Sequence, residues 1–220
     1  MLYPVFLQID GWPVMVAGGG PVALRKVRLL VRAGANVRLV APEASVPLRA
    51  LATSGKIVWR KRRFRPADLA GTRLAFACTD DLAVNAVILE SATRRNIPAQ
   101  SATHPETSAF HVPSSVVRGP VQIAFSTGGA SPALARRIRV EIEQLLPEGF
   151  ERYVRLLERV RRWQLGRGLA QEQNAAAFRA LVSRRLEKEV IGRRRTGAAR
   201  ILRSALGPSA PVDRLLKGLC

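Results

Sequence analysis

The sequence has few of the residues that define several common classes of protein. Its 220 residues include two cysteines, Cys78 and Cys220, which give neither a disulfide framework nor the spacing of a metal site and favour a reducing, cytoplasmic setting. No apolar run approaches the roughly 20 residues needed to span a bilayer, so we expect no membrane association. The first residues, MLYPVFLQIDGW, lack a basic leader and do not read as a signal peptide.

Acidic residues are scarce as well. There are 16 of them against 36 Lys and Arg, and the net charge is +20. The excess of positive charge is densest after residue 150, where the chain has 17 basic and 6 acidic residues. Such a charge fits a nucleic acid, an anionic membrane or a highly anionic small molecule, and it also fits the background of an Arg- and Ala-rich proteome. Aromatic residues make up 5% and are scattered, and no nucleic-acid-binding signature is present, so a nucleic-acid-binding regulator ranks last among the functions that the sequence suggests.

Short apolar stretches alternate with helical patterns through the first hundred residues. Val14–Ala17 lies between Pro13 and Gly18, which is typical of a buried strand. The stretch Val22–Ala33 has the length and composition of a helix and ends at a glycine. Further strands are expected at 36–42, 56–64 and 73–79, and a further helix at 82–96. Strands alternating with helices predict an α/β fold with a parallel sheet and right-handed crossovers.

The texture of the chain changes after residue 97. Residues 97–120 are rich in Ser, Thr, Pro and Ala and predict loops with short extended pieces. A strand at 121–127 and a helix between Pro132 and Pro147 follow. Beyond Pro147 the sequence is basic, with apolar residues at helical spacing. We therefore expect three parts, at 1–98, 99–147 and 148–220.

Three successive glycines stand at the first junction between strand and helix. Gly18, Gly20 and Ala23 fit the spacing G-x-G-x-x-[GA], in which side-chain-free backbone turns tightly and approaches a pyrophosphate. The N-terminus of the helix then supplies free N–H groups and a partial positive charge. The acid that usually bonds the ribose is missing at the end of the second strand, where Glu43 is the nearest carboxylate. No arginine directly follows that strand either, so the residues alone leave NAD and NADP open, with a lean to NAD.

Three blocks of sequence together resemble the precorrin-2 dehydrogenase/sirohydrochlorin ferrochelatase family, the N-terminal module of siroheme synthase. The blocks are PVFLQIDGWPVMVAGGGPVALRKVRLLVRAGANVRLVAPE, ACTDDLAVN and VQIAFSTGGASPALARRIRVEIEQLLP, in the family's order and spacing. The resemblance implies a Rossmann-like NAD-binding domain, a small central dimerisation region and a C-terminal helical domain. It also implies NAD-dependent oxidation of precorrin-2 to sirohydrochlorin, with iron insertion in some members, and a homodimer.

Position by position, the resemblance assigns coenzyme contacts to three segments. They are Gly18, Gly19, Gly20, Pro21 and Val22, then Pro42 and Glu43, and finally Thr79, Asp80, Asp81 and Asn85. For Asp80 and Asp81 an equally good alternative is capping of the helix that starts at Leu82.

The chain departs from the family at the residue proposed there as acid and base. The family reads Asn-Val-Val-Asp-x-Pro, whereas this chain reads QSATHP, which puts Thr103 in place of the aspartate. A threonine hydroxyl does not accept a proton near neutral pH, so iron insertion is the reaction that we expect to suffer most. Three alternatives stay open: oxidation survives through positioning, His104 replaces the base, or the protein only binds. His104 also fits a solvated loop histidine, and His111 is expected to be packed.

A second glycine pair offers a site for the substrate. Ser126, Gly128 and Gly129 precede a helix and fit either the binding of a substrate carboxylate or the closure of a turn. Precorrin-2 and sirohydrochlorin carry eight carboxylates, which the many arginines of this chain suit. We therefore predict an NAD-dependent precorrin-2 dehydrogenase acting on an anionic tetrapyrrole. The alternative is a non-catalytic tetrapyrrole-binding or carrier protein.

Overall fold

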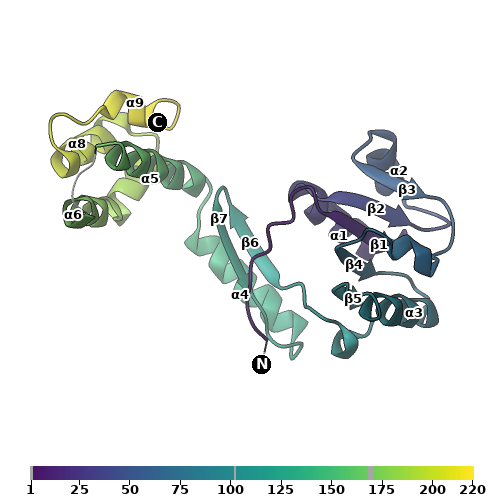
Figure 1. Cartoon of the computed structure of the whole chain (residues 1–220). Helices are drawn as coiled ribbons and strands as arrows, with labels where there is room; N and C mark the ends of the chain where they lie inside the picture. The colour runs from purple at the N-terminus through teal and green to yellow at the C-terminus, as the bar shows by residue number, and fades with distance from the viewer. Residues whose placement is uncertain (1, 102, 168–170) are drawn as a thin grey trace. The chain divides into compact units, whose positions relative to one another are not determined.

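The computed structural model describes residues 2–101, 103–167 and 171–220. They fall into two compact units, one ending at Val112 and the other beginning at Pro113 (Figure 1). The first unit runs past the boundary expected at residue 98. It does so because β5 (Ala99–Ser101) pairs with the sheet and the Phe110 ring lies edge-on to Phe76, with centroids 5.4 Å apart.

The first unit is built on a five-stranded parallel sheet. The sequence predicts the parallel arrangement and four of the strands, whereas β5 lies in a segment expected to be mostly loop. The strand order of the sheet is β3-β2-β1-β4-β5. The other four strands are β1 (Pro13–Ala17), β2 (Asn36–Val40), β3 (Ile57–Arg60) and β4 (Leu74–Ala77). Because β1 lies at the centre and the chain moves outward from it in both directions, the carboxyl ends of β1 and β4 flank the point where the strand order reverses, which is where α/β sheets bind ligands.

Alternate residues of the central strand pack on opposite faces of the sheet. Val14 and Val16 join the buried cluster of α1 (Pro21–Arg32) and α2 (Val46–Thr53). Met15 and Ala17 join the cluster of α3 (Leu82–Thr93). Successive side chains of a strand point to opposite faces, so an apolar run buried on both sides produces three layers.

Helix α2 lies in a segment whose residues show no helical pattern. It is short, it has Pro47 in its first turn, and Leu48 is its only buried residue among those that the structure describes. One apolar anchor in eight residues leaves no periodicity to detect.

The second unit begins with a hairpin. Strands β6 (Ser114–Arg118) and β7 (Val121–Phe125) pair antiparallel, and helix α4 (Pro132–Leu145) packs on β6. No residue of α4 is buried, although its apolar side chains recur at helical spacing.

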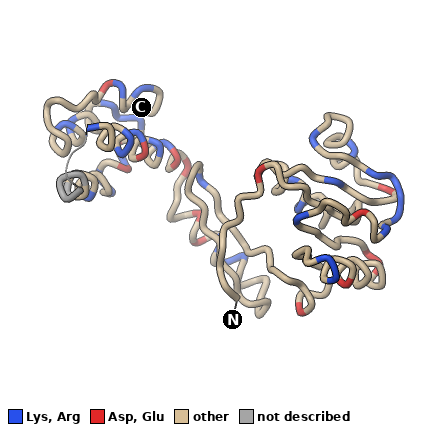
Figure 2. Tube along the Cα trace, in the orientation of Figure 1, with Lys and Arg blue, Asp and Glu red and all other residues tan. Residues whose placement is uncertain are grey.

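The basic C-terminal region is helical, as expected. Its helices are α5 (Phe150–Leu165), α6 (Gln171–Leu181), α7 (Arg184–Ile191), α8 (Arg195–Leu206) and α9 (Val212–Leu216). They share one buried cluster that includes Leu156, Leu186, Leu202 and Leu216. The Tyr153 hydroxyl donates to the Leu181 carbonyl at 3.0 Å and so ties α5 to α6. Lys and Arg recur along these helices (Figure 2), and none of those that the structure describes is buried. No described helix is long and apolar enough to cross a membrane.

Candidate functional site

The residues that directly follow β1, β2, β3 and β4 line one cavity of about 1280 Å³. Ten of the eleven predicted coenzyme-contact residues lie on its wall, the exception being Asn85. The ten are Gly18, Gly19, Gly20, Pro21, Val22, Pro42, Glu43, Thr79, Asp80 and Asp81. The fold thus brings together three segments that are far apart in the sequence.

The three glycines have different roles in this wall. Gly18 has a φ of +113°, and a Cβ there would meet the carbonyl of Cys78. A Cβ on Gly19 would meet the backbone of Glu43. Gly20 has an ordinary φ of −86° and empty space around it where a side chain would stand. The first two glycines therefore let backbone segments approach one another, and the third leaves the space beside the N-terminus of α1 free for phosphates, which fits a dinucleotide.

On the α3 side of the cavity the polar groups bond to one another. The Asp81 carboxylate accepts from the Val84 N–H at 3.1 Å, so this residue caps α3 as well as lining the cavity. Asn85 is fully buried beneath the wall. Its Oδ1 accepts from the N–H and the hydroxyl of Thr79, at 3.2 and 2.7 Å, which fixes the orientation of the amide.

The amide of Asn85 is hydrogen-bonded to Thr103, which stands where the family has its aspartate. Its Nδ2 donates to the Thr103 hydroxyl at 3.2 Å. That hydroxyl lies 3.0 Å from Ser101 Oγ and 2.9 Å from His104 Nδ1. Thr103 is exposed and His104 is half-buried, and neither lines the cavity.

These hydrogen bonds select the tautomer of His104. Ser101 Oγ accepts from the N–H groups of Thr103 and His104, so its own proton is left to donate to the Thr103 hydroxyl. The Thr103 oxygen then accepts from both Ser101 and Asn85, and its proton goes to His104 Nδ1. Neutral His104 accordingly carries its proton on Nε2, which makes that nitrogen a hydrogen-bond donor.

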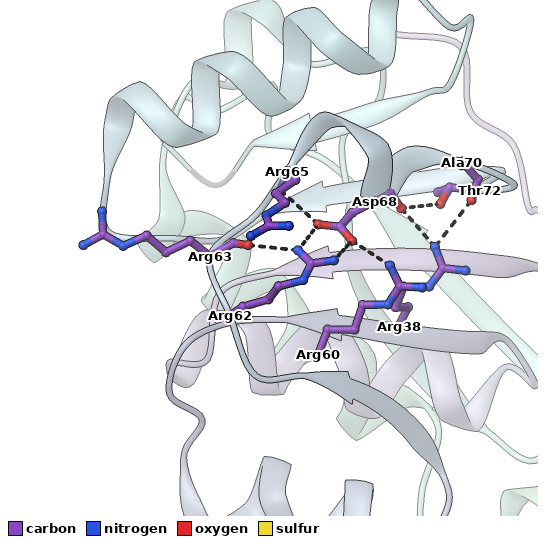
Figure 3. Close-up of polar contacts among 8 residues, drawn as sticks. All are labelled: Arg38, Arg60, Arg62, Arg63, Arg65, Asp68, Ala70 and Thr72. Atoms are coloured by element: carbon purple, nitrogen blue, oxygen red, sulfur yellow. Dashed lines mark hydrogen bonds and ion pairs between the residues drawn. The ribbon is translucent and has the colours of Figure 1, made fainter.

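On the β3 side, a buried carboxylate forms ion pairs with two arginines. Asp68 lies in the short helix η1 (Pro66–Leu69), and it is fully buried. It accepts from Arg60 at 2.8 Å, from both terminal nitrogens of Arg62 and from the Arg65 N–H (Figure 3). Burial alone would raise the pKa of Asp68, but these donors outweigh it and lower the pKa to about 2.

Five further residues on this side of the cavity are not among the predicted site residues. They are Arg49, Trp59, Lys61, Arg63 and Phe64. Trp59 Nε1 donates to the Ala41 carbonyl at 3.0 Å, which holds the indole against the end of β2. The signal for them was the basic run after the third strand, but it became meaningful only once β3 was placed beside β2.

Cys78 also lines the cavity without being a reactive group. Burial raises the pKa of its thiol to about 11, so the sulfur stays protonated at neutral pH.

The predicted substrate residues lie at the junction of β7 and α4. Gly128 and Gly129 have φ values of +63° and +86°. Ser126 Oγ accepts from the Gly128 N–H at 3.1 Å, so that N–H group is used to close the turn, and Ser131 caps α4. The role of Ser126 and the glycine pair in binding substrate stays a prediction. His111, expected to be packed, is exposed, because only its neighbour Phe110 packs against the core cluster of the sheet.

A central glycine cradle at the switch point of a parallel sheet defines the first unit as a Rossmann-type domain, the class of fold that binds dinucleotides. A family model described as "Putative NAD(P)-binding" matches residues 5–114, and one described as "Sirohaem biosynthesis protein central" matches residues 118–145. The chain therefore belongs to the precorrin-2 dehydrogenase/sirohydrochlorin ferrochelatase family, the N-terminal module of siroheme synthase.

Relatives support this membership. Siroheme synthase 1 of Aeromonas salmonicida is 45% identical over 145 residues, which cover 66% of this chain and 31% of that protein. Siroheme synthase 3 of Aeromonas hydrophila is 38% identical, over 79% of this chain and 42% of its own length. This chain thus spans less than half the length of either relative. The solved structure of SirC, precorrin-2 dehydrogenase, has the same fold, with a TM-score of 0.79, 22% identity, and coverage of 93% of this chain and 99% of SirC.

Proposed function

We propose that this protein oxidises precorrin-2 to sirohydrochlorin, with NAD as the oxidant. The observation that carries the proposal is the open space beside Gly20 at the N-terminus of α1, in a chain of this family. The relatives are named siroheme synthases, and the structural neighbour is named a precorrin-2 dehydrogenase.

The bound coenzyme would supply a hydride acceptor, and the chain's own residues would position it. The N–H groups at the start of α1 face the space for the pyrophosphate, and the Gly18 and Gly19 backbone closes the wall behind it. The Nε2–H group of His104 would donate a hydrogen bond to a carboxylate of the substrate. Since Thr103 supplies no base, the geometry favours oxidation over iron insertion.

We further propose that the protein acts as a homodimer. The hairpin β6–β7 is a two-stranded sheet, and α4 exposes Leu134, Val140 and Leu145. A second copy of this chain would cover these apolar side chains. Light scattering coupled to size-exclusion chromatography should give twice the 24.0 kDa mass of the chain, and a concentration-independent monomer would contradict the dimer.

The function is tested by turnover. Purified protein with precorrin-2 and NAD should produce NADH and sirohydrochlorin together, one of each per cycle. The absence of turnover with retained binding of sirohydrochlorin would instead support the carrier alternative. The cytoplasmic location stays a prediction.

A further inference from the structure

The end of β3 brings positive charge to the part of the cavity where a ribose is expected. In Rossmann-type domains the adenosine ribose lies at the carboxyl end of the second strand. Here Val40, the last residue of β2, pairs with Arg60, the last residue of β3. Lys61 and Arg63 follow at once and line the same cavity as the residues after β2.

Two of the four basic residues from 60 to 63 form ion pairs with one shared carboxylate. Arg60 and Arg62 pair with Asp68. Among the residues that the structure describes, no acidic group forms an ion pair with Lys61 or Arg63. Figure 3 shows the Arg63 side chain pointing away from Asp68, while its carbonyl accepts from Arg62 at 3.0 Å. Asp68 therefore anchors the loop and leaves these two cations for another anion.

Arg49 adds a third cation from helix α2. It donates one nitrogen to the Ala44 carbonyl at 3.0 Å, which fixes the guanidinium against the loop after β2 and leaves its other donors available. Arg49 lines the cavity as well.

The acidic residues of the wall lie mainly elsewhere. Asp80 and Asp81 follow β4, on the far side of the glycines from β3. Glu43 is the one acidic residue that the loop after β2 adds to the wall, within the part of the chain that the structure describes. The cavity is therefore polarised, with three cations and one carboxylate where the ribose is expected.

We propose that this cavity also accepts a dinucleotide that carries a 2′-phosphate, held by Lys61 and Arg63 with support from Arg49. The inference rests on the proposed coenzyme binding and extends it: NAD is not the sole coenzyme, because NADP fits the same site. A 2′-phosphate is a dianion beside the ribose, and guanidinium and ammonium groups form charge-assisted hydrogen bonds with it.

The test uses calorimetry on the full chain to compare the affinity for NADP with that for NAD. It also compares the affinity for adenosine 2′,5′-bisphosphate with that for AMP. The second pair isolates the 2′-phosphate from the nicotinamide. The double variant K61Q/R63Q removes both cations, and K56Q/R65Q is the matched control, since both of its exposed residues flank the same strand and loop without lining the cavity.

In the wild-type protein the dissociation constant of NADP should lie within about tenfold of that of NAD. In K61Q/R63Q the dissociation constants of NADP and of the bisphosphate should rise by about tenfold or more. Those of NAD and AMP should change less than about twofold. In K56Q/R65Q the dissociation constants of all four ligands should stay unchanged. Raising the salt concentration should weaken the binding of NADP more than the binding of NAD, because Lys61 and Arg63 are exposed and salt screens their charges.

The proposal is overturned if NADP binds the wild type more than about a hundredfold more weakly than NAD, or if K61Q/R63Q weakens both coenzymes equally. Each of these results leaves NAD binding in place. If neither coenzyme binds, the proposed function fails together with this inference.

Discussion

The two sides of the coenzyme cavity differ in how their polar groups are satisfied. On the α3 side, Thr79, Asp81 and Asn85 bond to one another and to the backbone around them. On the β3 side, Asp68 takes two of the neighbouring arginines, while Lys61 and Arg63 have no acidic partner among the described residues.

This difference shows what each side contributes. Groups that satisfy one another fix a geometry, and here they fix the orientation of Asn85 and, through Thr103, the tautomer of His104. Cations without a partner remain available to a ligand, at the cost of repelling one another when the site is empty. One side of the cavity therefore has a fixed arrangement of polar groups, and the other carries cations that a ligand could bind.

The largest effect is expected between the two sides, at Gly20. Gly20→Asp should weaken NAD binding by about a hundredfold or more, because the carboxylate occupies the space for the pyrophosphate and repels it. The φ of −86° suits any residue, so the fold should survive. Isothermal calorimetry measures the binding, and thermal unfolding checks the fold.

Gly20→Asn is the matched control for shape without charge. It should bind NAD more weakly than the wild type but more tightly than Gly20→Asp. Equal affinity of Gly20→Asp and wild type would mean that the phosphates lie elsewhere.

Asp68→Asn tests whether the β3 side depends on its buried carboxylate. We expect a loss of about 2 kcal/mol in the free energy of unfolding at neutral pH, at the low end for a buried pair because both arginines are partly exposed. Since the folded-state pKa is about 2 and the ordinary value 3.8, the contribution of Asp68 is complete above about pH 4 and is lost as the pH falls toward 2.

Urea unfolding as a function of pH measures this contribution. The wild type should lose its advantage over Asp68→Asn across that acid range. Asp213→Asn is the control, since it removes an exposed ion pair with Arg195 and should leave the free energy of unfolding nearly unchanged. A constant difference between wild type and Asp68→Asn down to pH 2 would exclude the proposed role of ionised Asp68.

The smallest effect is expected on the α3 side, at His104. His104→Ala should raise the KM for precorrin-2 and lower kcat/KM by about tenfold, because it removes one donor to a substrate carboxylate. The dissociation constant of NAD should not change. His104→Gln, which keeps an N–H donor, should recover part of the loss.

His111→Ala is the matched control, because His111 is the other histidine of the chain and is exposed. A fall in kcat at constant KM for precorrin-2 would assign His104 to proton transfer instead of substrate binding. An unchanged rate would remove His104 from the site altogether.

Much of the fold and the glycines of the cavity wall could be predicted because the signals are local. The apolar run before Gly18, the need for glycine beside the first helix and the helical spacing of the C-terminal residues each depend on neighbouring residues. Helix α2 was missed because a single buried leucine gives no period. His111 was misjudged because an apolar neighbour on each side does not show which of the three is covered.

The sequence by itself determined the alternation of strands and helices apart from α2 and β5, the glycine cradle and the net charge, because each depends on residues adjacent in the chain or on composition alone. The tertiary structure decided which of the many arginines face the coenzyme cavity. Pairing of β3 with β2 brings Lys61 and Arg63 to the same edge of the sheet as Gly20, and the position of Asp68 determines which of their neighbours form ion pairs. Long-range pairing and burial bring together residues that are distant in the sequence, and no local pattern records them.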